Sequence, residues 1–377
     1  MKKTALLVVG AGPYGLAVAA HAQAHGIDTQ IVGKPLGFWT DHMPEGMFLR
    51  SGADWHLDAA GIHTFEAFFE DRCISPSELD PIPINVFLEY ATWFQTQKHL
   101  VVDDRLVAAL DKQEAHLVAT LDDGSQIAAD QVVAAPGCGF FAHVPDWAAD
   151  LPDGAGGHTC EVVRFDQFAG RRVLIVGGRQ SAYEWAALLG EHGAERVDIV
   201  HRHDVPRFEH VSWRFVDDLV DATIRIPGWW RSLSPTEQDR ISRQFWEVGR
   251  LTLEWWLTPR LAHERFHLWP GTEVVGTSAE HGATVVHLSN GEEVQADHVI
   301  FATGYKVDLS NVPYLRPILS GIDVVDGFPQ LDNFFQCSIG GLYLPGFPAT
   351  RDFGPFFGFT KACPAAATRI VKGMQRR

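Results

Sequence analysis

The chain has 377 residues, 46% of them hydrophobic, and its 31 basic and 47 acidic side chains give a net charge of −16. This length suits two domains of ordinary size with real hydrophobic cores. The acidic balance argues against nucleic acid and against an anionic membrane surface as partners. The sequence contains no run of about 18 apolar residues, so it predicts no membrane span.

The five cysteines stand at positions 73, 138, 160, 337 and 363. No two of them are spaced as CxxC or CxxxxC, so the sequence predicts neither a zinc site nor a redox dithiol. We expect reduced thiols in a cytoplasmic protein, and no bound metal. Lys2-Lys3 and the apolar stretch after them imitate a secretory signal, but a nucleotide-binding turn explains the same residues better.

The first elements form a βαβ pattern. An apolar strand at Ala5–Val9 leads into the turn Gly10–Gly15, a helical pattern at Pro13–His25 and a second strand at Thr29–Val32. This is the context that a GxGxxG turn needs to bind a dinucleotide, because the turn presents backbone N–H groups and the helix start to the pyrophosphate. The candidate cofactor-binding residues here are Gly10, Gly12, Pro13, Tyr14 and Gly15.

The end of the second strand departs from the usual motif. An acidic residue for the adenosine ribose is expected about 20 residues after the turn. The sequence there reads Ile31-Val32-Gly33-Lys34, without an acid. We therefore expect backbone groups and Lys34 to hold the ribose.

The same plan recurs with an offset of 167 residues, from Gly10 to Gly177. A strand at Arg172–Val176, a turn, a helix from Gln180 to about His192 and a strand at Val197–Val200 repeat the first unit. Tight hairpin signals, Asp123-Gly124 and Asn290-Gly291, and the strands that end at Gly137 and Gly304 share this offset. The sequence therefore predicts two dinucleotide-binding units. Candidate cofactor-binding residues in the second turn are Gly177, Gly178, Arg179, Gln180 and Ser181.

Two arginines bear on the second dinucleotide. Arg179 stands where the middle glycine belongs, so its side chain either obstructs the pyrophosphate or swings out and pairs with a phosphate. The second strand of this unit ends at His201-Arg202, and an arginine there suits the 2′-phosphate of NADP. The alternative is a solvated surface arginine. We predict NADPH over NADH, with His201 and Arg202 among the cofactor-binding residues.

Extra material at about 205–268 interrupts the second unit and looks helical. Ser234-Pro235-Thr-Glu237 combines an N-cap, a first-turn proline and a capping-box glutamate. The simpler interpretation of its tryptophans is that they fill the core of a small helical subdomain. The sharper interpretation is that some of them cover a substrate pocket. The tryptophans are Trp213, Trp229, Trp230, Trp246, Trp255 and Trp256.

With these motifs, the chain resembles the class B flavin-dependent monooxygenases. The string Phe301-Ala-Thr303-Gly304-Tyr305 is similar to the FATGY motif of that family. Gly37-Phe-Trp39 is similar to the family's turn after the second strand. The segment with Gly346, Phe353, Gly354 and Pro355 resembles the part that returns beside the flavin ring. The Baeyer–Villiger fingerprint FxGxxxHxxxWP is absent, which disfavours ketone oxygenation.

The resemblance implies an α/β fold with two Rossmann-like, three-layer dinucleotide-binding domains, the second inserted in the first. It places the FAD-binding domain at 1–155 and 295–377, and the NADPH-binding domain at 156–294 with a small helical, Trp-rich insertion. It also adds Trp39, Gly137, Thr303, Gly304, Tyr305, Gly346, Phe353, Gly354 and Pro355 to the cofactor-binding residues.

The activity that the resemblance implies is an FAD-dependent, NADPH- and O2-using monooxygenase. It would hydroxylate a nitrogen, a sulfur or a ring atom of a small organic substrate through a flavin C4a-hydroperoxide. The segment 43–56 lies where related N-hydroxylases approach the flavin, so Arg50, Ser51 and Asp54 are the candidate catalytic residues. An ordinary loop with a structural Arg–Asp pair explains the same residues.

Two other functions remain open from the sequence. One is an NAD(P)H-dependent flavoprotein reductase that passes electrons to a quinone or a protein acceptor. The other is a non-catalytic nucleotide-binding protein, suggested by Arg179 and by the missing acid after Val32. The substrate and the oligomeric state are not predicted.

Overall fold

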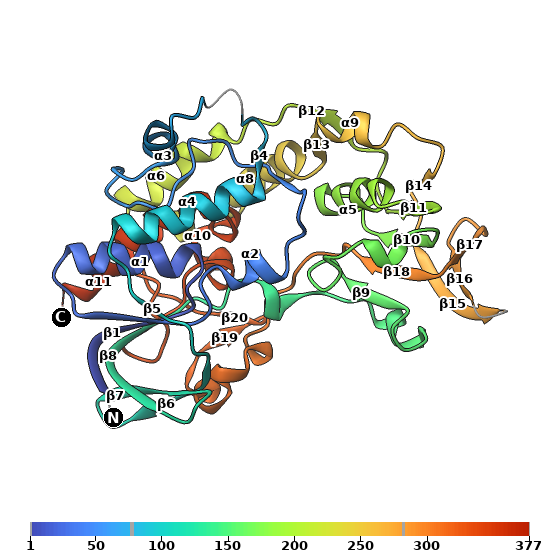
Figure 1. Cartoon of the computed structure of the whole chain (residues 1–377). Coiled ribbons are helices and arrows are strands. Elements are labelled where there is room, and N and C mark those ends of the chain that lie inside the picture. Colours follow the sequence, from blue (N-terminus) through green and yellow to red (C-terminus); the bar gives the residue numbers. More distant parts are fainter. Residues whose placement is uncertain (1, 76–78, 281–282, 377) are drawn as a thin grey trace.

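The computed structural model describes residues 2–75, 79–280 and 283–376, and its first domain is built on a seven-stranded sheet (Figure 1). The strand order is β5-β2-β1-β8-β7-β6, with β21 beside β8. Strand β1 pairs in parallel with β2 on one side and β8 on the other, whereas β6, β7 and β8 pair antiparallel. The strands are β1 Lys2–Val9, β2 Thr29–Val32, β5 Val102–Asp103, β6 Val107–Gln113, β7 His116–Leu121, β8 Gln126–Ala134 and β21 Leu342–Tyr343.

Helices α1 (Pro13–Ala24) and α11 (Cys363–Met374) pack against each other along this sheet (Figure 1). The run Gly15–Ala20 of α1 is buried on every side, and Ala365–Ala367 of α11 is buried as well. Small side chains let two helix backbones approach closely, which explains why the alanine-rich segments form this layer. The other helices of the domain are α2 Gly37–Asp41, α3 Phe65–Arg72, α4 Ile84–Gln97 and α10 Thr350–Phe353; short strand pairs are β3 Phe48–Leu49 with β4 Ile82–Pro83, and β19 Val324–Val325 with β20 Phe328–Pro329.

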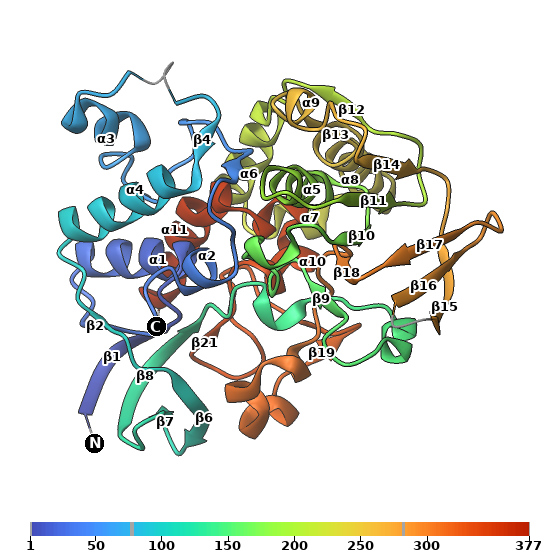
Figure 2. The same ribbon diagram turned by 45° about the vertical axis from the view of Figure 1, so that its right-hand side comes forward.

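The second domain contains a parallel sheet of order β14-β11-β10-β18-β9 (Figure 2). Its strands are β9 Gly156–His158, β10 Arg172–Val176, β11 Arg196–Val200, β14 Phe266–Trp269 and β18 His298–Phe301, and helix α5 spans Gln180–Glu191. An antiparallel meander of β15 Val274–Glu280, β16 Ala283–Leu288 and β17 Glu293–Ala296 precedes β18. Both predicted βαβ units are therefore present.

The predicted hairpins lie where the sequence placed them. Gly124 has φ +80° between β7 and β8, and Gly291 has φ +86° between β16 and β17. Glycine adopts this left-handed conformation without the penalty that a Cβ brings. The repeated spacing thus reflects a repeated fold.

The predicted domain boundary at residue 294 falls before a strand of the second sheet. Strand β18 pairs with β10 on one side and β9 on the other. These backbone hydrogen bonds attach residues 298–301 to the second domain, whereas β21 returns to the first sheet. We propose that the second boundary lies near residue 302.

The insertion does not form a core of its own. Trp213 and Trp230 pack into the first domain's core, and Trp256 packs into the second domain's core. Trp246 and Trp255 are 40% and 42% exposed. The interpretation that the tryptophans fill a separate subdomain core is therefore wrong for these residues, because the segment buries its apolar side chains against both neighbours instead.

Helices α6, α8 and α9 of the insertion lie in the upper part of the molecule in Figures 1 and 2. The predicted cap is confirmed, since the Ser234 hydroxyl accepts a hydrogen bond from the Glu237 amide at the start of α8. The elements are β12 Arg207–Glu209, α6 Asp217–Arg225, α7 Trp229–Ser232, α8 Pro235–Gly249, β13 Thr252–Glu254 and α9 Leu257–Arg260.

Candidate functional site

The first glycine turn lies at the carboxyl end of β1. Gly10 has φ +103°, and a Cβ there would overlap the carbonyl oxygen of Ala135. A Cβ on Gly15 would overlap the carbonyl oxygen of Gly10. A Cβ on Gly12 would meet nothing within 4 Å. The first and third glycines are thus required by packing, whereas Gly12 leaves open space in front of the α1 N-terminus, where a pyrophosphate binds in this kind of turn.

The second turn repeats the packing of the first. Gly177 has φ +134°, and its Cβ would overlap the carbonyl oxygen of Ala302, which stands 167 positions after Ala135. Gly178 is packed against the rings of His201 and His203. Each turn therefore packs against the end of the strand that follows the hairpin of its unit. That strand is β8 for the first turn and β18 for the second.

Arg179 extends from the second turn toward the insertion. Its guanidinium carbon lies 3.7 Å from the ring centroid of Trp246 on α8. Partial burial, together with the charges of Arg250 and Arg202, lowers the pKa of Arg179 to about 10. No ion pair holds its side chain among the described residues. The arginine is thus positioned by an aromatic face, which leaves its donors available for an anion.

The other predicted residues of the second unit differ in whether their side chains have protein partners or face solvent. The Gln180 side chain donates to Glu184 and accepts from the Glu254 amide, so it supports the turn. His201 is buried with its ring nitrogens at 3.0 Å from the Tyr183 hydroxyl and 2.8 Å from the His203 carbonyl oxygen, and burial lowers its pKa. Arg202 is exposed at the end of β11 and lies 3.9 Å from Glu273. Ser181 is exposed in the first turn of α5. Arg202 and Ser181 therefore face solvent, where a dinucleotide could reach them.

The C-terminal segment lies against the first turn. The Tyr14 hydroxyl is 2.5 Å from the Phe357 carbonyl oxygen and 3.0 Å from that of Phe359. A Cβ on Gly346, which has φ +83°, would touch the Tyr14 ring at 3.3 Å. Tyr14 thus positions this segment.

Two further residues of the same segment are packed. Phe353 stacks on Phe335 with centroids 3.6 Å apart, and Gly354 precedes Pro355 with φ +103°. A Cβ on Gly354 would crowd the ring of Phe356. These contacts give the segment one conformation beside the first turn.

Lys34 and Trp39 have protein partners in the described structure. The Lys34 ammonium lies 2.7 Å from the Asp41 carboxylate in a surface ion pair. Such pairs are weak and exchange readily with other anions. The Trp39 ring packs on Phe87 with centroids 4.5 Å apart. Lys34 therefore remains a candidate for the ribose, and Trp39 supports α2.

The two domains are joined where the ends of β8 and β18 cross. The His143 amide donates to the Gly304 carbonyl oxygen at 2.9 Å, and the Thr303 hydroxyl donates to the His143 carbonyl oxygen. The Tyr305 ring packs on His158 and Phe347. Gly137 and Gly304 have φ +71° and +78° at the two bends. These residues form the connection between the two turns.

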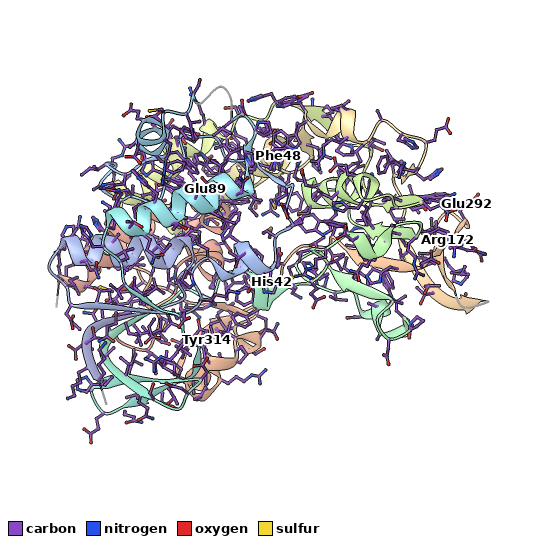
Figure 3. The ribbon with its side chains drawn as sticks, viewed as in Figure 1. His42, Phe48, Glu89, Arg172, Glu292 and Tyr314 are labelled. Atoms are coloured by element: carbon purple, nitrogen blue, oxygen red, sulfur yellow. The ribbon has the colours of Figure 1, made fainter. Side chains whose placement is uncertain are left out.

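His42, labelled near the centre of Figure 3, adds a contact across the same junction. Its Nδ1 lies 2.7 Å from the Cys160 carbonyl oxygen in the second domain. The residue lies just after α2 of the first domain. The junction therefore has contacts from the loop that follows the second strand as well as from the crossing strand ends.

The candidate catalytic loop is tied to the insertion. Arg50 donates to the Glu254 carboxylate at 2.9 Å and to the carbonyl oxygens of Gly249 and Thr252 at 2.5 and 2.8 Å. Asp54 instead pairs with Lys361 at 3.2 Å. The structural Arg–Asp pair that the sequence suggested is therefore absent, since each residue has a distant partner.

Glu254, Lys361 and Arg250 were missed by the sequence analysis, and Trp246 was named there only as one of the tryptophans of the insertion. The pair of Arg50 and Glu254 joins residues 204 positions apart, and no motif links them. Ser51 lies partly buried in the same loop. Whether Arg50, Ser51 and Asp54 contact reacting atoms stays a prediction.

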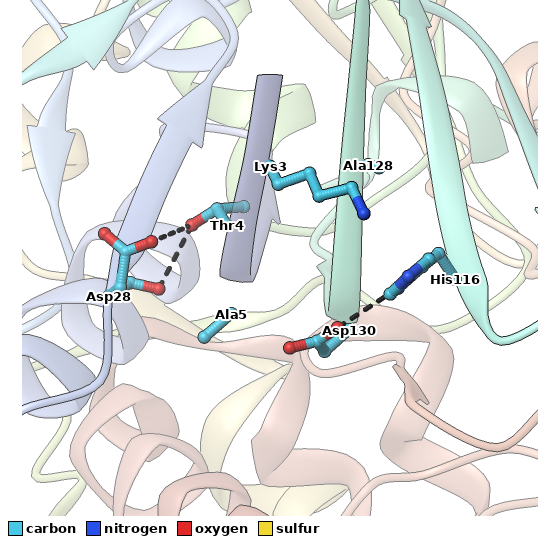
Figure 4. A pocket seen from close by; sticks show the side chains of 7 residues that line it. All are labelled: Lys3, Thr4, Ala5, Asp28, His116, Ala128 and Asp130. Carbon is cyan, nitrogen blue, oxygen red and sulfur yellow. Dashed lines mark hydrogen bonds and ion pairs between the residues drawn. The ribbon is translucent and has the colours of Figure 1, made fainter. Parts of the chain in front are cut away.

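A surface hollow of about 250 Å³ lies at the other end of the first sheet (Figure 4). The Thr4 hydroxyl donates to Asp28 there, and His116 lies 3.1 Å from Asp130. Dinucleotides bind at the carboxyl ends of parallel strands, whereas this hollow opens at the start of β1. We therefore assign it no part in cofactor binding. Its lining residues are Lys3, Thr4, Ala5, Asp28, His116, Ala128 and Asp130.

Residues 2–75, 79–280 and 283–376 hold no group of three or more His, Cys, Asp or Glu side chains that could bind a metal ion. None of the helices in those ranges is both long and apolar enough to cross a membrane. The five cysteines are all free.

Two sheets, each with a glycine turn at the carboxyl end of a parallel strand (β1 in the first and β10 in the second), define a protein built to hold two dinucleotides. Residues 7–215 match the pyridine nucleotide-disulphide oxidoreductase family, and the chain belongs to that family.

The relatives include reductases and monooxygenases. A ferredoxin–NADP reductase of Nocardioides sp. is 32% identical over 208 residues, which are 53% of this chain and 54% of that protein. The indole-3-pyruvate monooxygenase YUCCA1 of Oryza sativa subsp. japonica is 28% identical over 336 residues, or 81% of this chain and 77% of that protein. The chain spans about half the length of the first curated relatives that it matches, at 54%, 52% and 54%.

Among solved structures, the ornithine N-hydroxylase of Kutzneria sp. 744, with reduced FAD, NADP+ and L-ornithine, superposes with a TM-score of 0.84. The match covers 100% of this chain and 99% of that one at 16% identity. The predicted α/β fold with two dinucleotide-binding domains is confirmed. The resemblance to flavin-dependent monooxygenases is confirmed by the similarity to YUCCA1 and to the FAD-dependent urate hydroxylase of Xanthomonas campestris pv. campestris, which is 25% identical over 272 residues.

Proposed function

We propose that this chain is an FAD-dependent monooxygenase that uses NADPH and O2 to hydroxylate a small organic substrate at nitrogen, sulfur or a ring atom. The observation that carries this proposal is the pair of equivalent turns, Gly10–Gly15 and Gly177–Ala182, at the carboxyl ends of the parallel strands β1 and β10. Two dinucleotides bound at neighbouring turns can exchange a hydride.

The cysteines support an oxygenase over a disulfide reductase. Burial raises the pKa of Cys138 to about 12 and raises the pKa of Cys160 above its ordinary value. A thiol becomes a nucleophile only as the thiolate. These two thiols near the domain junction therefore stay protonated at neutral pH and are poor nucleophiles.

The residues of the chain would bind and orient the two cofactors. The open space at Gly12 and the start of α1 would take the FAD pyrophosphate, with Lys34 near the ribose. Arg202 would take the 2′-phosphate of NADPH. Bound FAD supplies the redox chemistry with NADPH and oxygen. Tyr14 holds the C-terminal segment beside the first turn, where that segment would exclude water.

The test combines cofactor content with product analysis. We expect the purified protein to be yellow with FAD, to oxidise NADPH and to form an oxygenated product across a panel of small amines, sulfides and aromatic acids. The matched variant is Gly12→Asp, which places a charge where the FAD pyrophosphate would lie and should yield colourless, folded protein. NADPH oxidation that yields only peroxide with every substrate class would contradict the proposal.

The second candidate function is an NAD(P)H-dependent flavoprotein reductase. It is favoured by the similarity to the ferredoxin–NADP reductase of Nocardioides sp.. Fast anaerobic turnover with a quinone or a ferredoxin, without an oxygenated product in air, would select this function. Rapid oxygen-dependent product formation and slow turnover with these acceptors would select the monooxygenase.

A further inference from the structure

Two arginines share one aromatic ring beside the second turn. The guanidinium carbons of Arg179 and Arg250 lie 3.7 and 5.2 Å from the ring centroid of Trp246. No carboxylate of the described chain forms an ion pair with either guanidinium. Two unpaired cations are thus held near one indole ring.

This arrangement is unfavourable without a ligand. Burial lowers the pKa of Arg250, and the charge of Arg250 adds to the lowering at Arg179. Carboxylates are abundant in a chain with 47 acidic residues, and other partly buried arginines have them. Arg50 pairs with Glu254, and Arg260 pairs with Glu184 at 2.6 Å. Arg265 and Arg369 have no ion pair either, but their guanidiniums donate to backbone carbonyl oxygens. Among the partly buried arginines of the described residues, Arg179 and Arg250 are the two whose side chains form neither an ion pair nor a hydrogen bond.

The pair lies at the second glycine turn and reaches the C-terminal segment that contacts the first turn. Arg179 is the residue that precedes α5 in the second turn, so it stands at the helix N-terminus. The guanidinium of Arg250 also lies 5.8 Å from the ring of Phe359, whose carbonyl oxygen accepts from Tyr14 of the first turn. An anion at this position would meet both guanidiniums and the N–H groups of α5.

The insertion brings Arg250 to this position from the first domain's side. Ile241 and Phe245 of α8 are buried in the first domain's core, whereas Trp246 on the same helix contacts Arg179 of the second domain. Helix α8 therefore links the two domains directly over the second turn.

We propose that Arg179 and Arg250 clamp the pyrophosphate of the nicotinamide dinucleotide, and that Trp246 positions both guanidiniums for it. This inference rests on the proposed function, because it assigns residues of the insertion to the NADPH site. A guanidinium pairs with phosphate oxygens through parallel hydrogen bonds, and that geometry explains arginine in place of the middle glycine.

The test measures binding of two probes by calorimetry. NADP+ carries the pyrophosphate, whereas adenosine 2′-monophosphate lacks it. The Arg250→Met variant should weaken NADP+ binding by about 10- to 100-fold, the equivalent of losing one or two charged hydrogen bonds. The same variant should bind adenosine 2′-monophosphate with a dissociation constant within about twofold of the wild-type value. Arg250→Lys should fall between wild type and Arg250→Met.

The matched control is Arg240→Met on the same helix. Arg240 pairs with Glu237 on the surface at 2.7 Å, so its loss removes the same charge and should leave both affinities unchanged.

A structural role for Arg250 predicts a different thermal result. Removal of an unpaired, partly buried cation should keep or raise the Tm of the ligand-free protein, whereas loss of a structural residue would lower it. The stabilisation that NADP+ gives should shrink in Arg250→Met.

Equal NADP+ affinity of wild type and Arg250→Met would overturn the clamp while leaving the proposed function intact. A lower Tm of ligand-free Arg250→Met together with unchanged NADP+ affinity would also overturn the clamp and leave the proposed function intact. Failure of the wild-type holoprotein to bind NADP+ at all would overturn both proposals together.

Discussion

The first and second turns share a backbone but differ in what surrounds it. In both turns the first glycine packs under a carbonyl oxygen, of Ala135 or of Ala302. The first turn then opens to space at Gly12, whereas the second carries Arg179, which lies on Trp246 of the insertion. At its middle position the first turn thus presents only backbone, whereas the second turn presents a side chain that contacts the insertion.

This difference teaches that the two turns of a duplicated fold can share a backbone and still have different surroundings. The glycines that shape the strand-to-helix bend serve packing and are shared. The residue at the middle position of the turn is free to change, provided that another element supports it. Four variants can break or sharpen this comparison.

The largest effect is expected from Gly10→Ala. The new Cβ would overlap the Ala135 carbonyl oxygen at a positive φ, so the free energy of unfolding should fall by about 3 kcal/mol. Urea titration measures this change in the free energy of unfolding. The control is Gly12→Ala, whose Cβ meets nothing within 4 Å and which should keep its stability while binding FAD more weakly. Equal destabilisation at both positions would remove the distinction between packing and ligand glycines.

The next effect concerns the link between the first-domain loop and the insertion. Glu254→Gln leaves Arg50 without a charged partner at a carboxylate position that is 3% exposed. The free energy of unfolding should fall by about 2 kcal/mol, because the partly buried guanidinium loses its charged partner but keeps the carbonyl oxygens of Gly249 and Thr252 as acceptors. Glu237→Gln breaks a surface pair and should have no measurable effect in the same urea titration. A neutral Glu254→Gln would mean that the insertion does not need this link.

Arg202→Met tests the selectivity of the second site. We expect the KM for NADPH to rise about tenfold while the KM for NADH changes little, because only NADPH carries the 2′-phosphate. Arg207→Met, which removes another exposed arginine of the same region, serves as the control. A parallel rise for both nucleotides would show that Arg202 contacts a group that they share.

The smallest effect is expected from Lys34→Met at the first site. Its ion pair with Asp41 is 55% and 42% exposed, so the unfolding transition should stay unchanged. The Kd for FAD, measured by flavin fluorescence, should rise less than about threefold if backbone groups hold most of the ribose. A much larger rise would make Lys34 the replacement for the missing acid.

Local patterns were sufficient to predict the elements near the turns. The strand at Thr29–Val32, the strand at Arg172–Val176 and the Ser234 cap agree with the structure. Each depends on residues within one strand or one helical turn, whose preferences act over short range. The repeat at one offset also predicted that the two units share a fold.

Contacts between distant segments could not be predicted in this way. The pair of Arg50 and Glu254 and the ring contact of Arg179 with Trp246 join a loop or turn to the insertion. The residue types alone allow many partners, so the Arg–Asp pair suggested inside the loop was wrong. Hydrophobic packing of the insertion against both domains decided which charges meet.

The order of residues along the chain was enough by itself to determine the two strand–turn–helix units, because their glycines and apolar runs act locally. The tertiary structure alone decided that the insertion buries Trp213 in one domain and Trp256 in the other, and so lies across the second turn. A short segment lowers its free energy by burying apolar surface wherever its neighbours offer it, and only the folded arrangement defines those neighbours.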